Sequence, residues 1–158
     1  MKQIYLSGKA KGKYTIVDDD MYEVLKKKSW HLSVKGYACS RSLMSEGNKT
    51  IRMHRVIMNT SKDMQVDHIN GDRLDNRRSN LRNCTPAENS RNMKVFRTNK
   101  SGFKGVCFGK KEKLWRATIR VNNRQLNVGY FKTPVEAAMA YNKAASEYYG
   151  EFARLNQL

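Results

Sequence analysis

The stretch VDHINGDRLDNRRSNLRNCTPAEN, residues 66–89, places the adjacent Asp67 and His68 among several Asn and Arg side chains. A neutral imidazole suits the removal of a proton from water near neutral pH. Carboxylate and amide oxygens suit a hard divalent cation, and Arg suits phosphate. Hydrolysis of a phosphodiester needs these components: an activated water and a cation beside the phosphate. An isolated Asp-His pair is more often a surface ion pair, so the surrounding elements decide between the two interpretations.

Those elements are predicted to be a strand, a loop, a second strand and a helix. The composition of MQVDHI and LRNCT predicts two strands. NGDRLDNRRSN between them is rich in turn residues, and PAENSRNMKV after them is predicted to be a helix. Thr85, Pro86 and Glu88 mark the helix start with a cap, a favoured first position and a capping box. Neighbouring strand residues point to opposite faces, so Asp67 and His68 share one site only where the strand is distorted or ends.

The spacing of these residues resembles the HNH endonuclease motif. Asn80 follows His68 by twelve residues and Asn89 follows it by twenty-one. The resemblance implies a ββα-metal fold in which Asp67 and Asn89 bind one divalent ion, Mg²⁺ or Mn²⁺. It makes His68 the general base and Asn80 a brace for the loop. Asn89, where many members have His, resembles the branch found in phage and intron homing endonucleases, and an amide oxygen favours ions harder than zinc.

Other polar residues in and around this stretch receive less specific interpretations. His31 and His54 lie outside the motif and are expected to be packed or hydrogen-bonded histidines. Asp72 and Asp75 fit turn and loop roles. Several arginines are expected to hold the DNA backbone: Arg77, Arg82 and Arg91.

The carboxyl-terminal third is predicted to be a three-stranded meander followed by a helix. LWRATIRV alternates between an apolar and a polar face, and Asn122-Asn123 suits a two-residue turn that fixes the register. The apolar pairs expected are Ile119 with Leu126, Ala117 with Val128 and Trp115 with Tyr130, and the polar pairs are Arg120 with Gln125 and Thr118 with Asn127. Thr133, Pro134 and Glu136 mark the start of an Ala-rich helix.

This segment resembles the plant apetala-two, or ethylene-response-factor, DNA-binding domain. The resemblance rests on GFKGV, the W-R-A-x-I-R strand, VGYF, TPVEAAMAYNKAA and YYGEFARLN. It implies that the sheet enters the DNA major groove while the helix supports it from behind. The residues expected to contact DNA on the polar face are Arg116, Thr118, Arg120, Gln125 and Asn127. Asn127 stands where plant members present a tryptophan.

The composition favours a nucleic-acid partner. The 158 residues carry 31 Lys and Arg against 14 Asp and Glu, a net charge of +17, and residues 67–132 hold +11 of it. The chain offers neither a long apolar run nor a basic amphipathic helix for a membrane. Three widely spaced cysteines fit neither a disulfide framework nor a Cys-based zinc site. We expect a cytoplasmic protein of a bacterial or phage-infected cell, which binds double-stranded DNA as a monomer.

These observations predict an α+β protein in four segments: a β-rich accessory region (1–51), an HNH ββα-metal unit (52–95), a basic linker (96–101) and a DNA-binding module (102–158). The function expected is that of a metal-dependent HNH endonuclease of the homing type that nicks DNA. A DNA-binding regulator with a degenerate nuclease motif is the main alternative. The charge alone also permits an RNA-binding protein.

Overall fold

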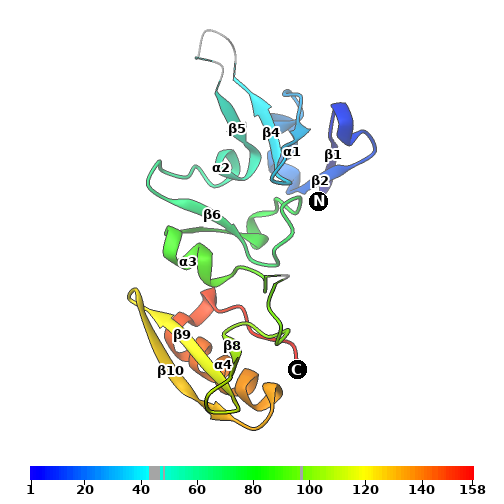
Figure 1. The fold of residues 1–158 in the computed structure, drawn as a ribbon. Helices are drawn as coiled ribbons and strands as arrows, with labels where there is room; N and C mark the ends of the chain where they lie inside the picture. The colour runs from blue at the N-terminus through cyan, green and yellow to red at the C-terminus, as the bar shows by residue number, and fades with distance from the viewer. Residues whose placement is uncertain (43–46, 48, 97) are drawn as a thin grey trace. The chain divides into compact units, whose positions relative to one another are not determined.

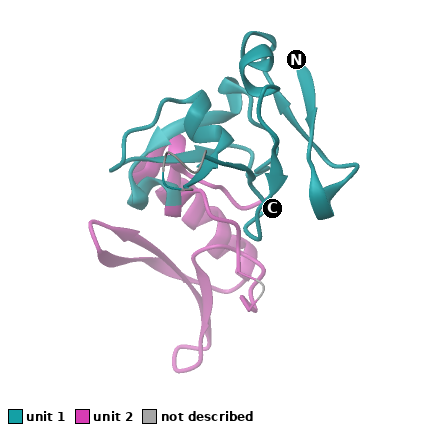
Figure 2. Cartoon of the chain, turned by 90° about the horizontal axis from the view of Figure 1, so that it is seen from above, with its two compact units in different colours: residues 1–89 teal, residues 90–158 magenta. Residues whose placement is uncertain are grey.

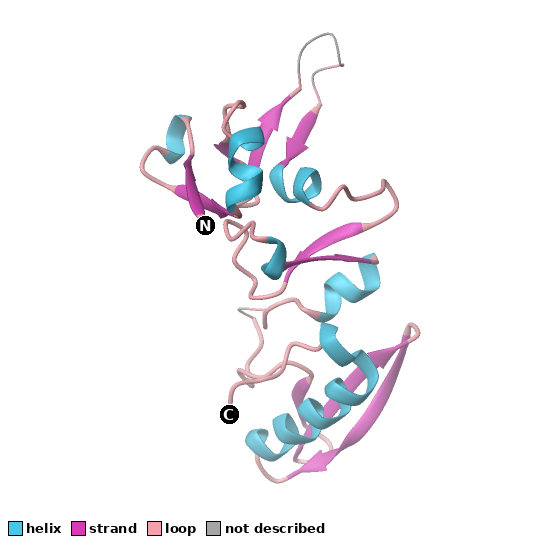
Figure 3. Ribbon diagram, turned by 180° about the vertical axis from the view of Figure 1, so that it is seen from behind, coloured by secondary structure: helices cyan, strands magenta, loops and turns pink. Residues whose placement is uncertain are grey.

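The computed structural model describes residues 1–42, 47, 49–96 and 98–158, and it divides into two compact units, Met1–Asn89 and Ser90–Leu158 (Figure 2). The first unit contains short helices and small antiparallel sheets, and the second contains one antiparallel sheet and a longer helix (Figure 3). This mixture agrees with the α+β class in its general form. Among the described residues, no helix is both long and apolar enough to cross a membrane.

The first unit contains three small sheets (Figure 1). Their strands are β1 Lys2–Tyr5 with β2 Tyr14–Val17; β3 His31–Leu32, β4 Ala38–Arg41 and β5 Thr50–Arg52; and β6 Gln65–His68 with β7 Leu81–Cys84. The helical segments are η1 Gly8–Ala10, α1 Asp19–Leu25, α2 Met53–Ile57, η3 Arg78–Asn80 and α3 Pro86–Arg91, which runs to the start of the second unit.

One hydrophobic core joins the elements of the first unit. Its buried side chains come from β1, β2, α1, β4, α2, β6 and β7. Trp30 is almost fully buried, and its indole N–H donates to the Leu25 carbonyl at 2.7 Å, closing the end of α1. The predicted accessory region 1–51 therefore shares its core with most of the predicted 52–95 unit.

The second unit is a three-stranded antiparallel sheet packed against a helix. Its elements are β8 Val106–Gly109, β9 Leu114–Val121, β10 Arg124–Phe131, α4 Pro134–Tyr149 and η4 Gly150–Phe152. β9 is the central strand, as the predicted meander requires. The capping box of Thr133 and Glu136 is present, and the alanines of α4 pack against Ala117 and Ile119. The predicted elements of this segment are confirmed.

The register of β9 with β10 corrects part of the prediction. Asn122 and Asn123 adopt φ of 48° and 61°, and the expected pairs hold from the turn as far as Thr118 with Asn127. A bulge then shifts the pairing, so that Ala117 faces Gly129 rather than Val128. Trp115 pairs with Phe131 and Arg116 with Tyr130, which moves Tyr130 from the predicted apolar face to the polar one.

Two further element boundaries differ from the prediction. The strand-like composition of NKTIRMHR, residues 48–55, predicts a strand to residue 55, but β5 ends at Arg52. Met53–Ile57 instead forms α2, which buries Met53 and His54. Helix α3 ends at Arg91 instead of continuing to residue 95. The sequence also predicts a loop at MSEGN, residues 44–48, but most of it lies outside the described residues, which exclude 43–46 and 48.

Candidate active site

The loop between β6 and β7, residues 69–80, is closed by Asn80. The Asn80 carbonyl accepts from the Ile69 N–H at 2.9 Å. Its side-chain oxygen accepts from the Asn70 N–H at 3.0 Å, and its amide nitrogen donates to the Asp75 carbonyl at 2.8 Å. Because Asn80 is buried, these bonds are shielded from water and hold the loop directly after His68. The bracing role of Asn80 stays a prediction, to which these bonds give a structural basis.

The amino-terminal region also holds this loop. The Asn76 N–H donates to the Ile16 carbonyl at 2.8 Å, and the Ile16 N–H donates to the Leu74 carbonyl at 2.9 Å. The Arg78 backbone N–H donates to Asp18 at 2.8 Å, and the Arg78 guanidinium pairs with Asp20 at 2.6 Å. The loop therefore depends on β2 and on the start of α1.

His68 is the last residue of β6, and it is buried in a cluster of rings. Its ring centroid lies 5.1 Å from that of His54 and 5.8 Å from that of Tyr37. Its Nε2 lies 3.3 Å from Oδ1 of Asn76. Burial lowers the pKa of His68, and the hydrogen bond with Asn76 partly opposes this effect. His68 is therefore neutral near neutral pH, as a base that accepts a proton must be.

Asp67 leaves β6 on the opposite face from His68. Its Oδ2 accepts from Arg82 Nε at 3.0 Å and from Arg82 Nη2 at 2.7 Å, in a pair whose side chains are largely buried. The backbone pairing of β6 with β7 stays regular as far as His68 with Leu81. The strand distortion that sequence considerations allowed is therefore absent between Asp67 and His68, and the two faces meet only where β6 ends.

Asn89 lies on the Asp67 side of the β6–β7 pair. Its Nδ2 donates to Oε1 of Gln65 at 2.6 Å, and Gln65 shares a strand face with Asp67. Together Asp67 and Asn89 offer a carboxylate and an amide oxygen, which is a donor set that suits Mg²⁺ or Mn²⁺. Within the described ranges, no three His, Cys, Asp or Glu side chains gather as a metal centre. Any ion would compete with Arg82 for the Asp67 carboxylate.

The arginines expected to hold DNA each have a partner within the protein. Arg77 forms an ion pair with the buried Asp75 at 2.6 Å, and Arg82 pairs with Asp67. The guanidinium of Arg91 lies over the Tyr149 ring, 4.9 Å from its centroid.

The five sheet residues expected to contact DNA lie along the same face of β9 and β10, away from α4. Gln125 donates to Thr118 at 3.1 Å, and Arg120 and Asn127 are exposed. Arg116 lies between Cys107, 3.7 Å from Nη2, and Tyr130, which the bulge brings opposite it.

Three residues around His68 were not singled out for chemistry from the sequence: Thr15, Tyr37 and Asn76. Asn76 lies inside the NGDRLDN stretch, where its composition suggested only a turn. Thr15 and Tyr37 come from the amino-terminal region, and no local pattern links them to His68. His54 is buried among these rings, in agreement with the packed histidine that was expected.

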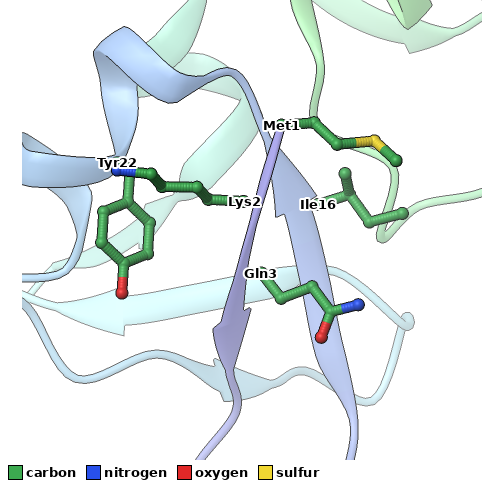
Figure 4. Close-up of a pocket in the computed structure, with 5 residues that line it drawn as sticks. All are labelled: Met1, Lys2, Gln3, Ile16 and Tyr22. Atoms are coloured by element: carbon green, nitrogen blue, oxygen red, sulfur yellow. The ribbon is translucent and has the colours of Figure 1, made fainter.

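A separate cavity of about 510 Å³ lies beside β1 and β2 (Figure 4). It is lined by Met1, Lys2, Gln3, Ile16 and Tyr22. The Lys2 ammonium lies 4.8 Å from the Tyr22 ring centroid. None of these five side chains is among the predicted site residues.

Comparison with known proteins places the same segment in a family. The profile described as HNH endonuclease matches residues 53–91. The chain is 32% identical over 159 residues to an uncharacterized HNH endonuclease of Acanthamoeba polyphaga mimivirus, covering 97% of this chain and 80% of that protein. It is 37% identical over 93 residues to Protein 3.8 of Escherichia phage T7, covering 59% and 76% of the two chains. No solved structure matches the chain.

Proposed function

Because the chain belongs to the HNH endonuclease family, we propose that it is a metal-dependent DNA endonuclease of the homing type that nicks its target. The observation that carries this proposal is the state of His68: a buried, neutral imidazole at the end of β6, held by Asn76 and followed by a loop that Asn80 closes. A phosphodiester bound at the end of β6 would contact His68 on one face of this strand and Asp67 with Asn89 on the other.

In the proposed reaction, His68 takes a proton from the water that attacks phosphorus. The bond from phosphorus to the 3′ oxygen breaks, so the product carries a 5′-phosphate. Asp67 and Asn89 would hold the divalent ion, which supplies positive charge to the departing oxygen when it is bound. Asn80 keeps the loop in place and touches no reacting atom in this scheme. One such site cuts one strand.

The target would be located by the polar face of the β8–β10 sheet. Arg, Gln and Asn side chains suit hydrogen bonding to base edges. Four of the five predicted contact residues on this face are of these types, and the fifth is Thr118. The bulge adds Tyr130, a residue that is 42% exposed and pairs with Arg116. We therefore extend the proposed DNA contacts to Tyr130, together with Arg116, Thr118, Arg120, Gln125 and Asn127.

The proposal is tested by incubating supercoiled plasmid with Mg²⁺ and either the wild-type protein or His68→Ala. The wild type should convert supercoiled DNA to the open circular form, and the variant should lose about 100-fold or more of the rate. His31→Ala is the matched control, because His31 lies in β3 outside the ring cluster. Binding of all three proteins to the same DNA should be equal.

The alternative, a non-cutting DNA-binding regulator, has one observation in its favour. Arg82 already neutralises the Asp67 carboxylate, as it would in a site that has lost its ion. If the wild type binds plasmid but opens none of it across Mg²⁺ and Mn²⁺ concentrations, the regulator is correct and the endonuclease proposal fails.

A further inference from the structure

A buried hydrogen-bond chain connects β2 to His68. It begins at Thr15, which is fully buried and whose Oγ1 lies 2.7 Å from the Leu74 carbonyl oxygen. A carbonyl oxygen only accepts hydrogen bonds, so the single hydroxyl proton of Thr15 is donated to Leu74. Met53 Sδ, 3.9 Å from the same hydroxyl, is a weak acceptor and does not compete.

The second step fixes the orientation of the Asn76 side chain. Thr15 Oγ1 lies 2.7 Å from the amide of Asn76, which is also fully buried. Because the hydroxyl proton is already used, Oγ1 accepts here, and the group that donates to it is the amide nitrogen Nδ2. The amide oxygen Oδ1 then faces His68.

The third step fixes the proton on His68. Oδ1 of Asn76 lies 3.3 Å from His68 Nε2, and an amide oxygen only accepts. Nε2 therefore carries the proton, which leaves the lone pair of the neutral ring on Nδ1.

We infer that Thr15 and Asn76 are positioning residues that hold His68 in the tautomer protonated at Nε2, so that Nδ1 is the atom that accepts the proton of water. The inference rests on the proposed role of His68 as the base. It also gives the amino-terminal region a function, because β2 contributes Thr15 and pairs through Ile16 with the loop that carries Asn76.

The tautomer is measured by the ¹⁵N chemical shifts of the His68 ring nitrogens in the metal-free, full-length wild-type protein. The expected spectrum has a protonated, pyrrole-like Nε2 and an unprotonated, pyridine-like Nδ1. A protonated Nδ1 with an unprotonated Nε2 overturns the inference. The wild-type protein suffices for this measurement, so the test stands even where a variant fails to fold.

The chain of contacts is tested by comparing Thr15→Val with Thr15→Ser. Valine keeps the shape but removes the hydroxyl, so the Asn76 amide loses the acceptor that orients it. We expect kcat for nicking to fall roughly 10- to 100-fold, the range found when partners behind a reacting group are removed. KM and DNA affinity should stay unchanged, and serine should restore most of kcat. Equal kcat values for valine and wild type, with an unchanged ¹⁵N spectrum, would overturn the role of Thr15.

These outcomes separate the inference from the function on which it rests. A wild-type protein that nicks DNA with the proton on Nδ1 disproves the inference alone. A protein with the proton on Nε2 that cuts no DNA disproves the proposed function while the hydrogen-bond chain stands.

Discussion

At the scale of single residues, the Asp67–Arg82 pair determines how the site responds to cations. The two side chains are only 6% and 12% exposed, and their closest N–O distance is 2.7 Å. Removing one partner of a buried pair is costly because the other charge loses its compensation. The same carboxylate is the proposed metal ligand, so an arginine and a divalent ion are alternatives there.

We predict that Arg82→Gln lowers the free energy of unfolding by about 3 kcal/mol in EDTA. Mg²⁺ should raise the melting temperature of this variant more than that of the wild type, because the ion no longer competes with a guanidinium. Thermal denaturation with and without Mg²⁺, at matched ionic strength, checks both statements. Arg77→Gln is the control, since it breaks the Asp75 pair outside the proposed ligand set. An equal response of all three proteins to Mg²⁺ would contradict Asp67 as a ligand.

His54 makes the first unit sensitive to acid. Burial is the main cause that lowers the pKa of His54 from 6.5 to about 3, and the neighbouring His68 contributes to this shift in the same direction. Between these two pH values the unfolded chain binds a proton that the folded chain does not. The folded state therefore loses stability as the pH falls from 6.5 toward 3.

Replacing this histidine should remove that part of the pH dependence. The slope contributed by one proton is about 1.4 kcal/mol per pH unit. Urea titrations across this range should show a shallower slope for His54→Leu than for the wild type. His31→Leu, altered at a half-buried site in β3, is the matched control for the loss of a histidine. A slope for His54→Leu as steep as that of the wild type would assign the acid sensitivity to other groups.

At the scale of elements, Gly105 forms a backbone hydrogen bond with the part of β9 that lies beyond the end of β8. β8 pairs with β9 only as far as Ala117, and beyond it the Gly105 carbonyl accepts from the Thr118 N–H at 2.8 Å. Further along β9, the Tyr149 hydroxyl accepts from the Arg120 N–H and donates to the Arg120 carbonyl. Gly105 and Tyr149 thus supply hydrogen-bond partners for backbone groups of β9 that β8 does not pair.

Gly105→Ala should destabilise the second unit far more than Gly102→Ala. Both glycines have φ of 75°, a conformation that costs other residues about 1 kcal/mol or more. A Cβ at 105 would lie 2.1 Å from Tyr141 Cδ2 and 2.7 Å from the Thr118 carbonyl, whereas a Cβ at 102 meets nothing within 4 Å. The difference in melting temperature between the two variants measures the clash. Equal melting temperatures would mean that the Tyr141 side chain moves aside at no measurable cost in stability.

Elements signalled by neighbouring residues were predictable from the sequence. The capping boxes at Thr85 and Thr133, and the turn at Asn122-Asn123, form as expected because each depends on residues two to four positions apart. The bulge after Asn127 was not predictable in this way, because it is a property of the pairing between β9 and β10 and not of residues close together in the sequence. The position of Tyr130 follows from the shifted pairing.

At the scale of the whole molecule, the site depends on contacts between residues distant in sequence. Thr15 and Asn76 are separated by 61 positions, and Arg78 and Asp18 by 60. The motif residues Asp67, His68, Asn80 and Asn89 could be found from their spacing, since that spacing is written in one short segment. The partners that orient them could not, because only the folded core brings β2 against the loop.

The net charge of +17 predicts DNA binding that weakens steeply with salt, and the sheet face predicts which charges matter. Arg120 is exposed on the polar face, whereas Arg124 pairs with Val121 on the face that packs toward α4. Arg120→Gln and Arg124→Gln carry the same net charge, so a difference between them reports contact rather than overall charge. Loss of a base contact should weaken binding to the DNA target by about 1–3 kcal/mol in Arg120→Gln, with little change in Arg124→Gln. Equal affinities of the two variants for the same DNA at one salt concentration would show that Arg120 does not contact the bases.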